Sequence, residues 1–251
     1  MNNIDNKLNG SFYLELMRKC LCNTIYGDDP IDPWSGGVYR EDVRKLGRDW
    51  PSKAHSMIGE LRMLNIQILI EHILENEIPG DFIETGVWRG GACIFMRAIL
   101  KAHGDTNRSV WVADFFEGLP PPQPEYLADT GDKHHKYTQL AVSQEDVEAN
   151  FRTYNLLDGQ VKFLKGWFKD TLPEADIQKL ALLRLDGDMY ESTFTALTYL
   201  YPKLVSGGFV IVDDYGAVPG CRQAIEDYRH QYGITAMIHD IDGAGVYWQK
   251  Q

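Results

Sequence analysis

The chain has 251 residues and a formal net charge of −11 at pH 7, from 36 acidic and 25 basic side chains. A composition that is 44% hydrophobic and 24% charged is typical of a globular protein with a sizeable core, which excludes a disordered or collagen-like chain. The acidic balance argues against nucleic acid and against an anionic membrane surface as partners, because both attract a basic face.

The first 80 residues are predicted to be mainly helical. Apolar residues recur at helical spacing over residues 12–25 and 52–76, and a loop rich in Gly, Pro and Asp covers residues 27–37. We expect residues 1–80 to form a helical extension that packs on the main domain or makes oligomer contacts, and residues 81–251 to form that domain. The polar N-terminus lacks the apolar stretch of a secretory signal, and no apolar run reaches the length of a membrane span. We therefore expect a cytoplasmic protein without membrane insertion.

From residue 81 onward, short apolar strands alternate with helices. The predicted strands cover residues 81–86, 109–116, 161–164, 180–185, 208–212, 235–240 and 244–249. Such alternation predicts an α/β fold with a doubly wound, mostly parallel seven-stranded sheet and right-handed crossovers. The last two strands are joined around Asp242–Gly243 and form a C-terminal antiparallel hairpin. The long loop over residues 117–142 is unusual inside a compact domain, and such loops often act as functional lids.

Ligands of open α/β sheets bind beyond the carboxyl ends of the strands, so the residues there are the first candidates for a site. The first strand runs into a loop in which Gly86 and Gly90 permit a tight turn and close approach of a ligand to the backbone. Glu84 would repel a pyrophosphate and suits a ligand with an ammonium group, although a plain tight turn explains the loop equally well. Asp114 ends the second strand, where it can accept hydrogen bonds from the ribose hydroxyls of an adenosine ligand. Together these residues predict a nucleoside site.

Four aspartates follow two strands that we expect to be neighbours in the sheet: Asp186, Asp188, Asp213 and Asp214. A divalent cation would relieve their mutual repulsion, and an all-oxygen ligand set favours Mg²⁺, Mn²⁺ or Ca²⁺ over Zn²⁺. The alternative is an Asp-Gly turn and an exposed pair of carboxylates without an ion. One of the four can remain off the metal and act as a general base. His134 or His135, in the long loop, is either an alternative base or a solvated loop histidine.

With these motifs in place, the chain resembles the macrocin O-methyltransferase family, whose members methylate deoxysugar hydroxyls on macrolide and aminocoumarin antibiotics. The matching segments are ETGVWRGG (84–91), DFFEGLP (114–120), GWFKDTLP (166–173), RLDGDMYE (184–191) and GGFVIVDDY (207–215). The resemblance runs from about residue 13 to residue 248. It implies the Rossmann-like sheet of class I S-adenosylmethionine (SAM) methyltransferases, with SAM and Mg²⁺ as cofactors.

The resemblance also implies a role for each matching residue. The expected SAM site consists of Glu84, Gly86 and Gly90 beside the methionine part, Asp114 on the ribose, and Gly166 and Trp167 near the adenine. The expected Mg²⁺ ligands are Asp188, Asp213 and Asp214, and Asp186 is then the candidate general base. Residues 27–50 and 120–142 would shape the acceptor site, so the N-terminal extension would cover the acceptor.

The predicted function is therefore a Mg²⁺-dependent O-methyltransferase that transfers the methyl group of SAM to a hydroxyl of a deoxysugar on a glycosylated natural product or glycan. One alternative is a metal-dependent methyltransferase with a catechol-like or other non-sugar acceptor. Another is a protein that binds SAM without catalysis, such as a hydroxylase-associated partner. The expected partners are a small-molecule glycoside acceptor and further copies of the chain, in a dimer or a higher assembly.

Overall fold

The computed structural model describes the backbone of residues 3–251 and the side chains of residues 10–251, so residues 1 and 2 of the predicted extension lie outside the described residues. Its sheet has seven strands in the order β3-β2-β1-β4-β5-β7-β6. The strands are β1 (Asp81–Thr85), β2 (Val110–Asp114), β3 (Val161–Lys165), β4 (Leu180–Leu185), β5 (Leu204–Val212), β6 (His239–Asp240) and β7 (Val246–Gln249). The first five strands pair in parallel and β7 runs antiparallel to β5 and β6, which confirms the predicted α/β fold.

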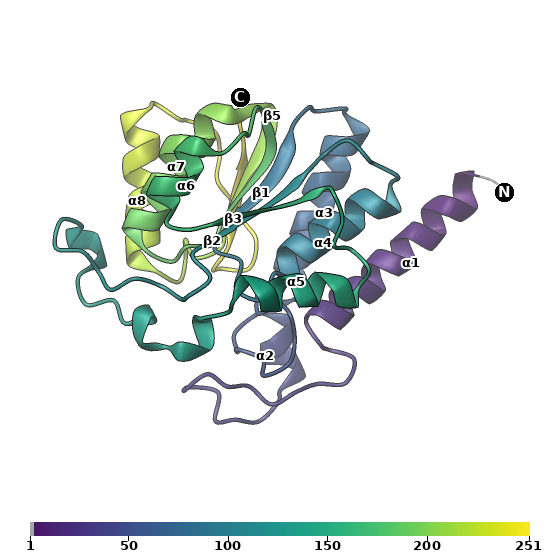
Figure 1. Cartoon of the computed structure of the whole chain (residues 1–251), viewed down its shortest axis with the longest axis horizontal. Helices are drawn as coiled ribbons and strands as arrows, with labels where there is room; N and C mark the ends of the chain where they lie inside the picture. Colours follow the sequence, from purple (N-terminus) through teal and green to yellow (C-terminus); the bar gives the residue numbers. More distant parts are fainter. Residues whose placement is uncertain (1–2) are drawn as a thin grey trace.

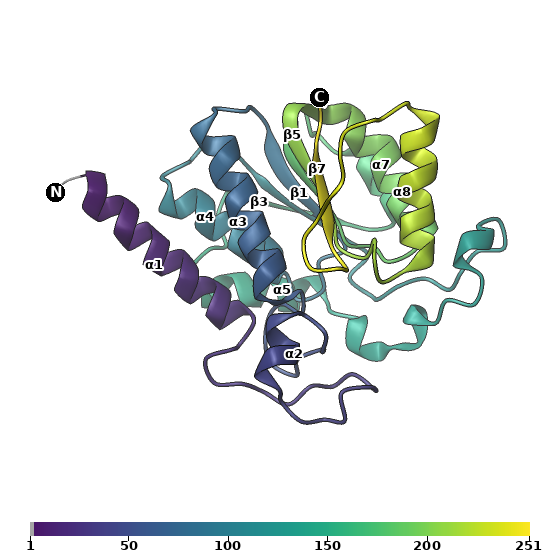
Figure 2. The same ribbon diagram turned by 180° about the vertical axis from the view of Figure 1, so that it is seen from behind.

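Helices cover both faces of the sheet, as the views from front and back show (Figures 1 and 2). The α-helices are α1 (Asn3–Leu21), α2 (Glu41–Lys45), α3 (Gly59–Glu75), α4 (Gly91–Ala102), α5 (Gln144–Thr153), α6 (Phe168–Glu174), α7 (Tyr190–Leu200) and α8 (Pro219–Gln231). The 3₁₀ turns are η1 (Leu127–Asp129), η2 (His134–Lys136), η3 (Thr138–Leu140) and η4 (Tyr201–Lys203). Among the described residues, no helix combines the length and the apolar character that crossing a bilayer requires.

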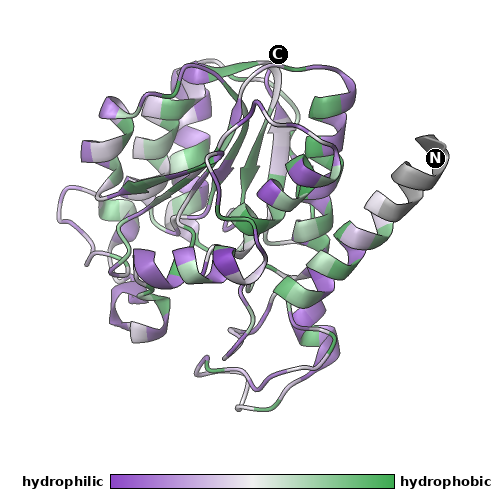
Figure 3. Cartoon of the chain, turned by 45° about the vertical axis from the view of Figure 1, so that its right-hand side comes forward, coloured by the Kyte–Doolittle hydropathy of each residue, from purple (hydrophilic) through white to green (hydrophobic). Residues whose placement is uncertain are grey.

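The central strand β4 is buried along its whole length, because helices cover both of its faces. One apolar cluster joins α1, α3, α4 and α5 to one face of the sheet, and a second joins α6, α7 and α8 to the other face. Figure 3 shows the matching hydropathy pattern, with mostly hydrophobic strands at the centre and helices that carry both kinds of residue. This packing directs the carboxyl ends of the parallel strands to one edge of the sheet.

Several predicted boundaries differ from those in the structure. The helix expected over residues 52–76 begins only at Gly59, because the backbone N–H groups of His55 and Ser56 both donate to the carbonyl of Leu21 at the end of α1. These bonds hold the preceding segment in an irregular conformation. The short helix α6 was not predicted, since it is only seven residues long and contains Pro173. The strand expected over residues 235–240 shortens to the two residues of β6.

The N-terminal extension shares the core of the sheet. Leu14 and Leu21 of α1 belong to the same apolar cluster as Phe82 of β1. The loop between α1 and α2 is fixed by the buried guanidinium of Arg44, which donates to Asp28 Oδ1 and Asp49 Oδ1 at 2.7 Å each. Because leaving either buried carboxylate unpaired would be costly, this loop has one defined position beside the sheet.

Candidate active site

A cavity of ≈ 1030 Å³ opens where the parallel strands end. Its wall contains nine of the ten residues predicted from the sequence: Glu84, Gly86, Asp114, Gly166, Trp167, Asp186, Asp188, Asp213 and Asp214. Gly90, the tenth, lies just outside the wall as the N-cap of α4. Pockets for a drug-sized ligand occupy about 300–1,000 Å³, so this cavity lies at the upper end of that range.

The loop after β1 is pressed against the loop after β4. Gly86 has a φ of +85°, and a Cβ there would lie 1.9 Å from the carbonyl oxygen of Asp186. Gly90 also has a positive φ, of +82°, where the chain turns into α4. Glycine is therefore required at position 86 to bring the predicted nucleoside loop next to the acidic loop.

Asp114 is fixed at the end of β2 by backbone amides. Its Oδ2 accepts the N–H of Val87 and its Oδ1 accepts the N–H of Phe116, both at 2.7 Å. Burial raises the pKa of Asp114, and these backbone hydrogen bonds oppose that rise. The expected contacts with ribose hydroxyls would have to be made alongside these backbone bonds.

Glu84 is 1% exposed and already has partners in the protein. The Sγ of Cys93 donates to Glu84 Oε2 at 2.8 Å, and Arg184 donates to Glu84 Oε1. Burial raises the pKa of Glu84 to about 7, although the charge of Arg184 lowers it. The expected contact of Glu84 with the methionine part of SAM thus has to be made alongside these two bonds.

A stacked aromatic pair adds a flat wall near Asp114. The rings of Phe115 and Trp167 have centroids 3.7 Å apart and planes inclined by 12°, and both line the cavity. Trp167 was predicted near the adenine, whereas Phe115 was missed, although its place directly after Asp114 at a strand end was a usable signal. The pair fits the predicted position of a purine ring, because aromatic faces stack favourably in offset geometry.

Three of the four aspartates gather on the opposite side of the cavity. Asp186, Asp213 and Asp214 each offer a carboxylate oxygen within 4.8 Å of the others. Asp214 Oδ2 is buried and has no hydrogen-bond partner among the residues that the structure describes, and burial raises the pKa of Asp214 far above its usual value. An all-carboxylate set with a buried, unpartnered oxygen is suited to a hard cation such as Mg²⁺.

Two arginines partly balance this charge. Arg62 of α3 and Arg184 of β4 each donate to a different oxygen of Asp213. Arg184 also donates to Asp186 Oδ2 at 2.6 Å. Burial raises the pKa of Asp186 to about 6, while Arg184 lowers it. Sequence reasoning missed Arg62, because nothing in the local pattern of α3 indicates a partner some 150 residues away.

Asp188 lies outside the group of three and faces the long loop instead. It has a left-handed φ of +59°, and its Oδ1 is 4.0 Å from Nε2 of His134. The Nδ1 of His134 is in turn 2.6 Å from Asp132 Oδ2. Burial raises the pKa of Asp188 to about 7, while His134 lowers it. Of the two loop histidines, His134 lines the cavity, whereas His135 is not part of its wall.

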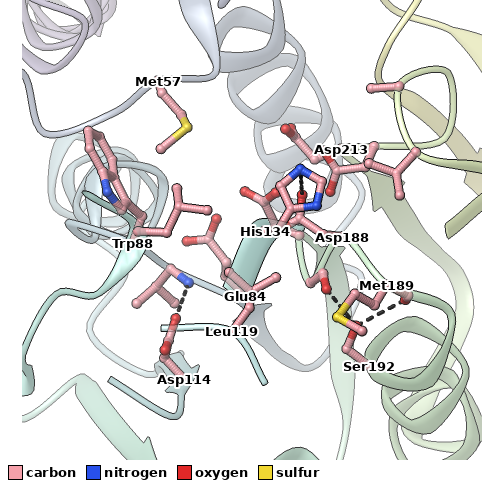
Figure 4. A pocket seen from close by; sticks show the side chains of 18 of the residues that line it. Met57, Glu84, Trp88, Asp114, Leu119, His134, Asp188, Met189, Ser192 and Asp213 are labelled. Carbon is pink, nitrogen blue, oxygen red and sulfur yellow. Dashed lines mark hydrogen bonds and ion pairs between the residues drawn. The ribbon is translucent and has the colours of Figure 1, made fainter. Parts of the chain in front are cut away.

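The cavity thus has two chemically distinct sides. In Figure 4, Trp88 and Asp114 lie on one side, and His134, Asp188 and Asp213 lie on the other. The long loop is held over the cavity by Asp129, whose buried carboxylate accepts the backbone N–H groups of Tyr190 (2.6 Å) and Glu191 (3.1 Å) at the start of α7. No sequence signal pointed to Asp129.

The family model described as Macrocin-O-methyltransferase (TylF) matches residues 10–250. The chain belongs to the macrocin O-methyltransferase family. It is therefore a SAM-dependent methyltransferase, and the resemblance inferred from its motifs is confirmed.

Relatives of this methyltransferase match it over nearly their whole length. It is 52% identical over 248 residues to demethyldecarbamoylnovobiocin O-methyltransferase of Streptomyces niveus, which covers 96% of this chain and 94% of that protein. It is 55% identical over 240 residues to 8-demethyl-8-(2,3-dimethoxy-alpha-L-rhamnosyl)-tetracenomycin-C 4'-O-methyltransferase of Streptomyces olivaceus, with 94% and 92% covered. The solved structure of the O-methyltransferase NovP matches it with a TM-score of 0.92 at 52% identity, over 96% of this chain and 99% of that chain.

One prediction concerns Asp114, the residue expected to bind the ribose. We expect Asp114→Asn to weaken binding of S-adenosylhomocysteine by about 10- to 100-fold, the usual effect of losing hydrogen bonds to a charged group. Titration calorimetry would measure it. The matched control is Glu117→Gln, since Glu117 is exposed and lies outside the cavity wall. Unchanged affinity in the Asp114 variant would show that this carboxylate only braces the loop.

Proposed function

We propose that this enzyme transfers the methyl group of SAM to a hydroxyl of a sugar on a glycosylated natural product, and that it requires Mg²⁺. The sugar acceptor is supported by the relative from Streptomyces olivaceus, whose name describes a methyltransferase of a rhamnosyl-tetracenomycin. The metal requirement rests on one observation, the grouping of three carboxylates with the unpartnered Oδ2 of Asp214 in the cavity wall.

The proposed metal ligands are Asp186, Asp213 and Asp214. This assignment exchanges two roles predicted from the sequence, where Asp188 was a ligand and Asp186 the base. The exchange is supported by distance, since Asp186 shares the group of three and Asp188 does not. When bound, Mg²⁺ would orient the acceptor and stabilise the negative charge that develops on its oxygen.

Asp188 is then the proposed general base. It takes the proton of the acceptor hydroxyl, while the oxygen forms a bond to the methyl carbon of SAM. The carbon–sulfur bond breaks and its electron pair stays on sulfur, which leaves S-adenosylhomocysteine. His134 lies beside Asp188 and is held by Asp132, so it orients this carboxylate from the long loop. Asp114 and the stacked aromatic pair would hold the nucleoside part of SAM on the side of the cavity opposite the acidic group.

The decisive experiment is a calorimetric titration of the metal-free protein with S-adenosylhomocysteine and then with Mg²⁺, followed by methyl-transfer assays on glycosides and catechols. We expect micromolar binding of the nucleoside, a separate Mg²⁺ site and turnover of glycosides only. Turnover of catechols but not glycosides would transfer the same chemistry to a non-sugar acceptor. Binding of the nucleoside without turnover of any acceptor would favour a non-catalytic SAM-binding protein. Methyl transfer at full rate in excess chelator would refute the metal requirement.

We also propose that two copies of the chain associate through α1 and α3. These helices pack against one another, and both leave apolar side chains in water. On α1, Phe12 is 67% and Leu16 is 54% exposed, and on α3 Ile68 is exposed. Apolar groups clustered in this way often mark an interface between proteins.

For this interface we expect Leu16→Glu to convert the assembly into a monomer, because the new carboxylate would be buried without a partner. Size-exclusion chromatography with light scattering would measure the mass. Tyr232→Glu is the control, since Tyr232 is an exposed aromatic residue at the end of α8. A wild-type protein that is already monomeric would refute the proposal.

Two further predictions from the sequence remain proposals. The first is the boundary at residue 80 between the helical extension and the methyltransferase domain. Limited proteolysis would test this boundary. Because the two parts share an apolar core, we expect them to unfold together. The second is a cytoplasmic location, which cell fractionation of the producing organism would test.

A further inference from the structure

Trp34 lies at the rim of the active-site cavity, in the loop between α1 and α2, and 56% of its side chain is exposed. Its one polar group already has a partner, because the indole N–H donates to the carbonyl of Arg48 at 3.2 Å. The ring itself is therefore the only part that Trp34 offers to a ligand. Rings of this kind bind flat apolar groups by stacking and make no use of directed hydrogen bonds.

The ring of Trp34 is also held in place before any ligand arrives. The buried carboxylate of Asp32 accepts the backbone N–H groups of Trp34 (3.1 Å), Ser35 (2.7 Å) and Trp50 (2.9 Å), so it ties the turn to the strand-like segment at Trp50. Trp34 packs edge-on against the ring of Trp50, with centroids 4.8 Å apart and planes at 74°. Because little freedom remains to be lost, the ring can bind a ligand at low entropic cost.

A row of ring contacts connects Trp34 with the reacting groups. The ring of Trp50 is 5.2 Å from that of Tyr137, and Tyr137 is 6.2 Å from His134, centroid to centroid. His134 lies beside Asp188 at the acidic side of the cavity. Trp34 and His134 line the same cavity, so an acceptor whose hydroxyl lies at Asp188 would reach Trp34 with the group attached to its sugar.

The charge of the cavity wall indicates what that group is. Carboxylate side chains outnumber arginine and lysine side chains along the wall. Arg62 is occupied by Asp213 and Asp242, which leaves Arg48 and Lys169 against the carboxylates. Outside the proposed Mg²⁺ site, a diphosphate between the sugar and its attached group would find only Arg48 and Lys169 to neutralise its charge. The wall therefore favours an uncharged link between the sugar and a flat group.

We propose that Trp34 is the stacking platform for a flat, uncharged ring system linked to the acceptor sugar. In this role Trp34 determines which groups attached to the sugar are accepted, while the inner cavity recognises the sugar itself. This inference rests on the proposed sugar acceptor. It also assigns a function to the loop between α1 and α2, which sequence analysis placed near the acceptor without naming a residue in it.

The test compares binding of three rhamnosides to the enzyme saturated with S-adenosylhomocysteine and Mg²⁺: methyl rhamnoside, 2-naphthyl rhamnoside and thymidine-diphosphate rhamnose. We expect the wild type to bind the naphthyl glycoside about 10-fold tighter than the methyl glycoside, the usual gain from stacking on one aromatic ring. Trp34→Ala should abolish this preference without changing the affinity for the methyl glycoside, and Trp34→Phe should keep part of it. Tyr26→Ala is the matched control, because Tyr26 is 90% exposed and lies outside the cavity wall.

The proposal would be overturned if the wild type did not prefer the naphthyl glycoside, or if Trp34→Ala kept this preference. Tighter binding of the nucleotide sugar than of the naphthyl glycoside would overturn it as well, because the favoured link would then be charged. Methyl transfer to methyl rhamnoside is assayed in the same variants. This assay distinguishes failure of the Trp34 proposal from failure of the proposed function. If that transfer persists while the preference does not depend on Trp34, sugar methylation stands and only the platform is refuted. If no glycoside is methylated at all, the proposed function fails.

Discussion

Asp188→Asn is expected to lower kcat by about 100- to 10,000-fold, the range for loss of a general base, while leaving the binding of S-adenosylhomocysteine and Mg²⁺ at wild-type levels. Asparagine keeps the shape of the side chain but cannot take the proton of the acceptor hydroxyl. Asp188 lies outside the group of three carboxylates, so its replacement removes no proposed metal ligand. Single-turnover kinetics would measure the chemical step, and calorimetry the two affinities.

Asp186→Asn is the matched variant, since it changes the same residue type two positions earlier in the same turn. We expect it to weaken Mg²⁺ binding, because one of three clustered carboxylates is lost. The two proposals for this turn therefore make opposite predictions. If Asp186→Asn retained the metal and lost kcat, while Asp188→Asn lost the metal, the original assignment from the sequence would be correct.

A further variant would test how His134 acts through Asp188. His134→Gln should lower kcat with little change in the acceptor KM, because His134 orients the base and lies 4.0 Å from it. A loss smaller than that of Asp188→Asn is expected, since the carboxylate itself remains. An equal loss would assign the proton transfer to the histidine instead.

The second large effect concerns the buried carboxylate of Asp214. Asp214 Oδ2 has no hydrogen-bond partner in the described part of the chain, so its burial is expected to destabilise the metal-free fold. We expect Asp214→Asn to abolish activity at ordinary Mg²⁺ concentrations and also to raise the thermal stability of the metal-free protein. Binding to the folded state alone stabilises by about 2.7 kcal/mol at a hundredfold excess over Kd, so Mg²⁺ should stabilise the wild type and not the variant.

Thermal unfolding with and without Mg²⁺ would measure both parts of this prediction. Asp29→Asn is the control, because Asp29 is exposed and outside the cavity, and it should respond to Mg²⁺ as the wild type does. The metal assignment would be wrong if Mg²⁺ stabilised the Asp214 variant as strongly as the wild type. Excess chelator should reproduce the loss of activity in the wild-type enzyme, and added Mg²⁺ should restore it.

Much of this protein could be predicted from the sequence, because regular elements are encoded locally. The apolar runs and helical stripes gave the alternation of strands and helices, and that alternation leaves few possible sheet topologies. The rule that ligands bind at the carboxyl ends of strands then placed Asp114 and the four aspartates at one edge. Motifs at those ends identified the family without any coordinates.

What the sequence could not determine are the directions of side chains in irregular segments. Asp186 and Asp188 are equivalent in any local pattern, and only the left-handed backbone at Asp188 places one beside His134 and leaves the other with Asp213 and Asp214. The conformation of this turn depends on ion pairs and ring contacts with residues from distant segments of the chain.

The same physical reason explains the rim of the cavity. Trp34 contacts Trp50, and Trp50 contacts Tyr137, which follows it by about ninety residues. The second contact depends on how two loops without periodicity pack over the sheet. The partnership of Arg62 with Asp213 and the hold of Asp129 on the start of α7 are also long-range. The sequence by itself therefore determined the fold, the family and the edge that carries the chemistry. Tertiary packing alone decided which carboxylates lie together and which rings line the cavity, because loops take their conformation from distant partners.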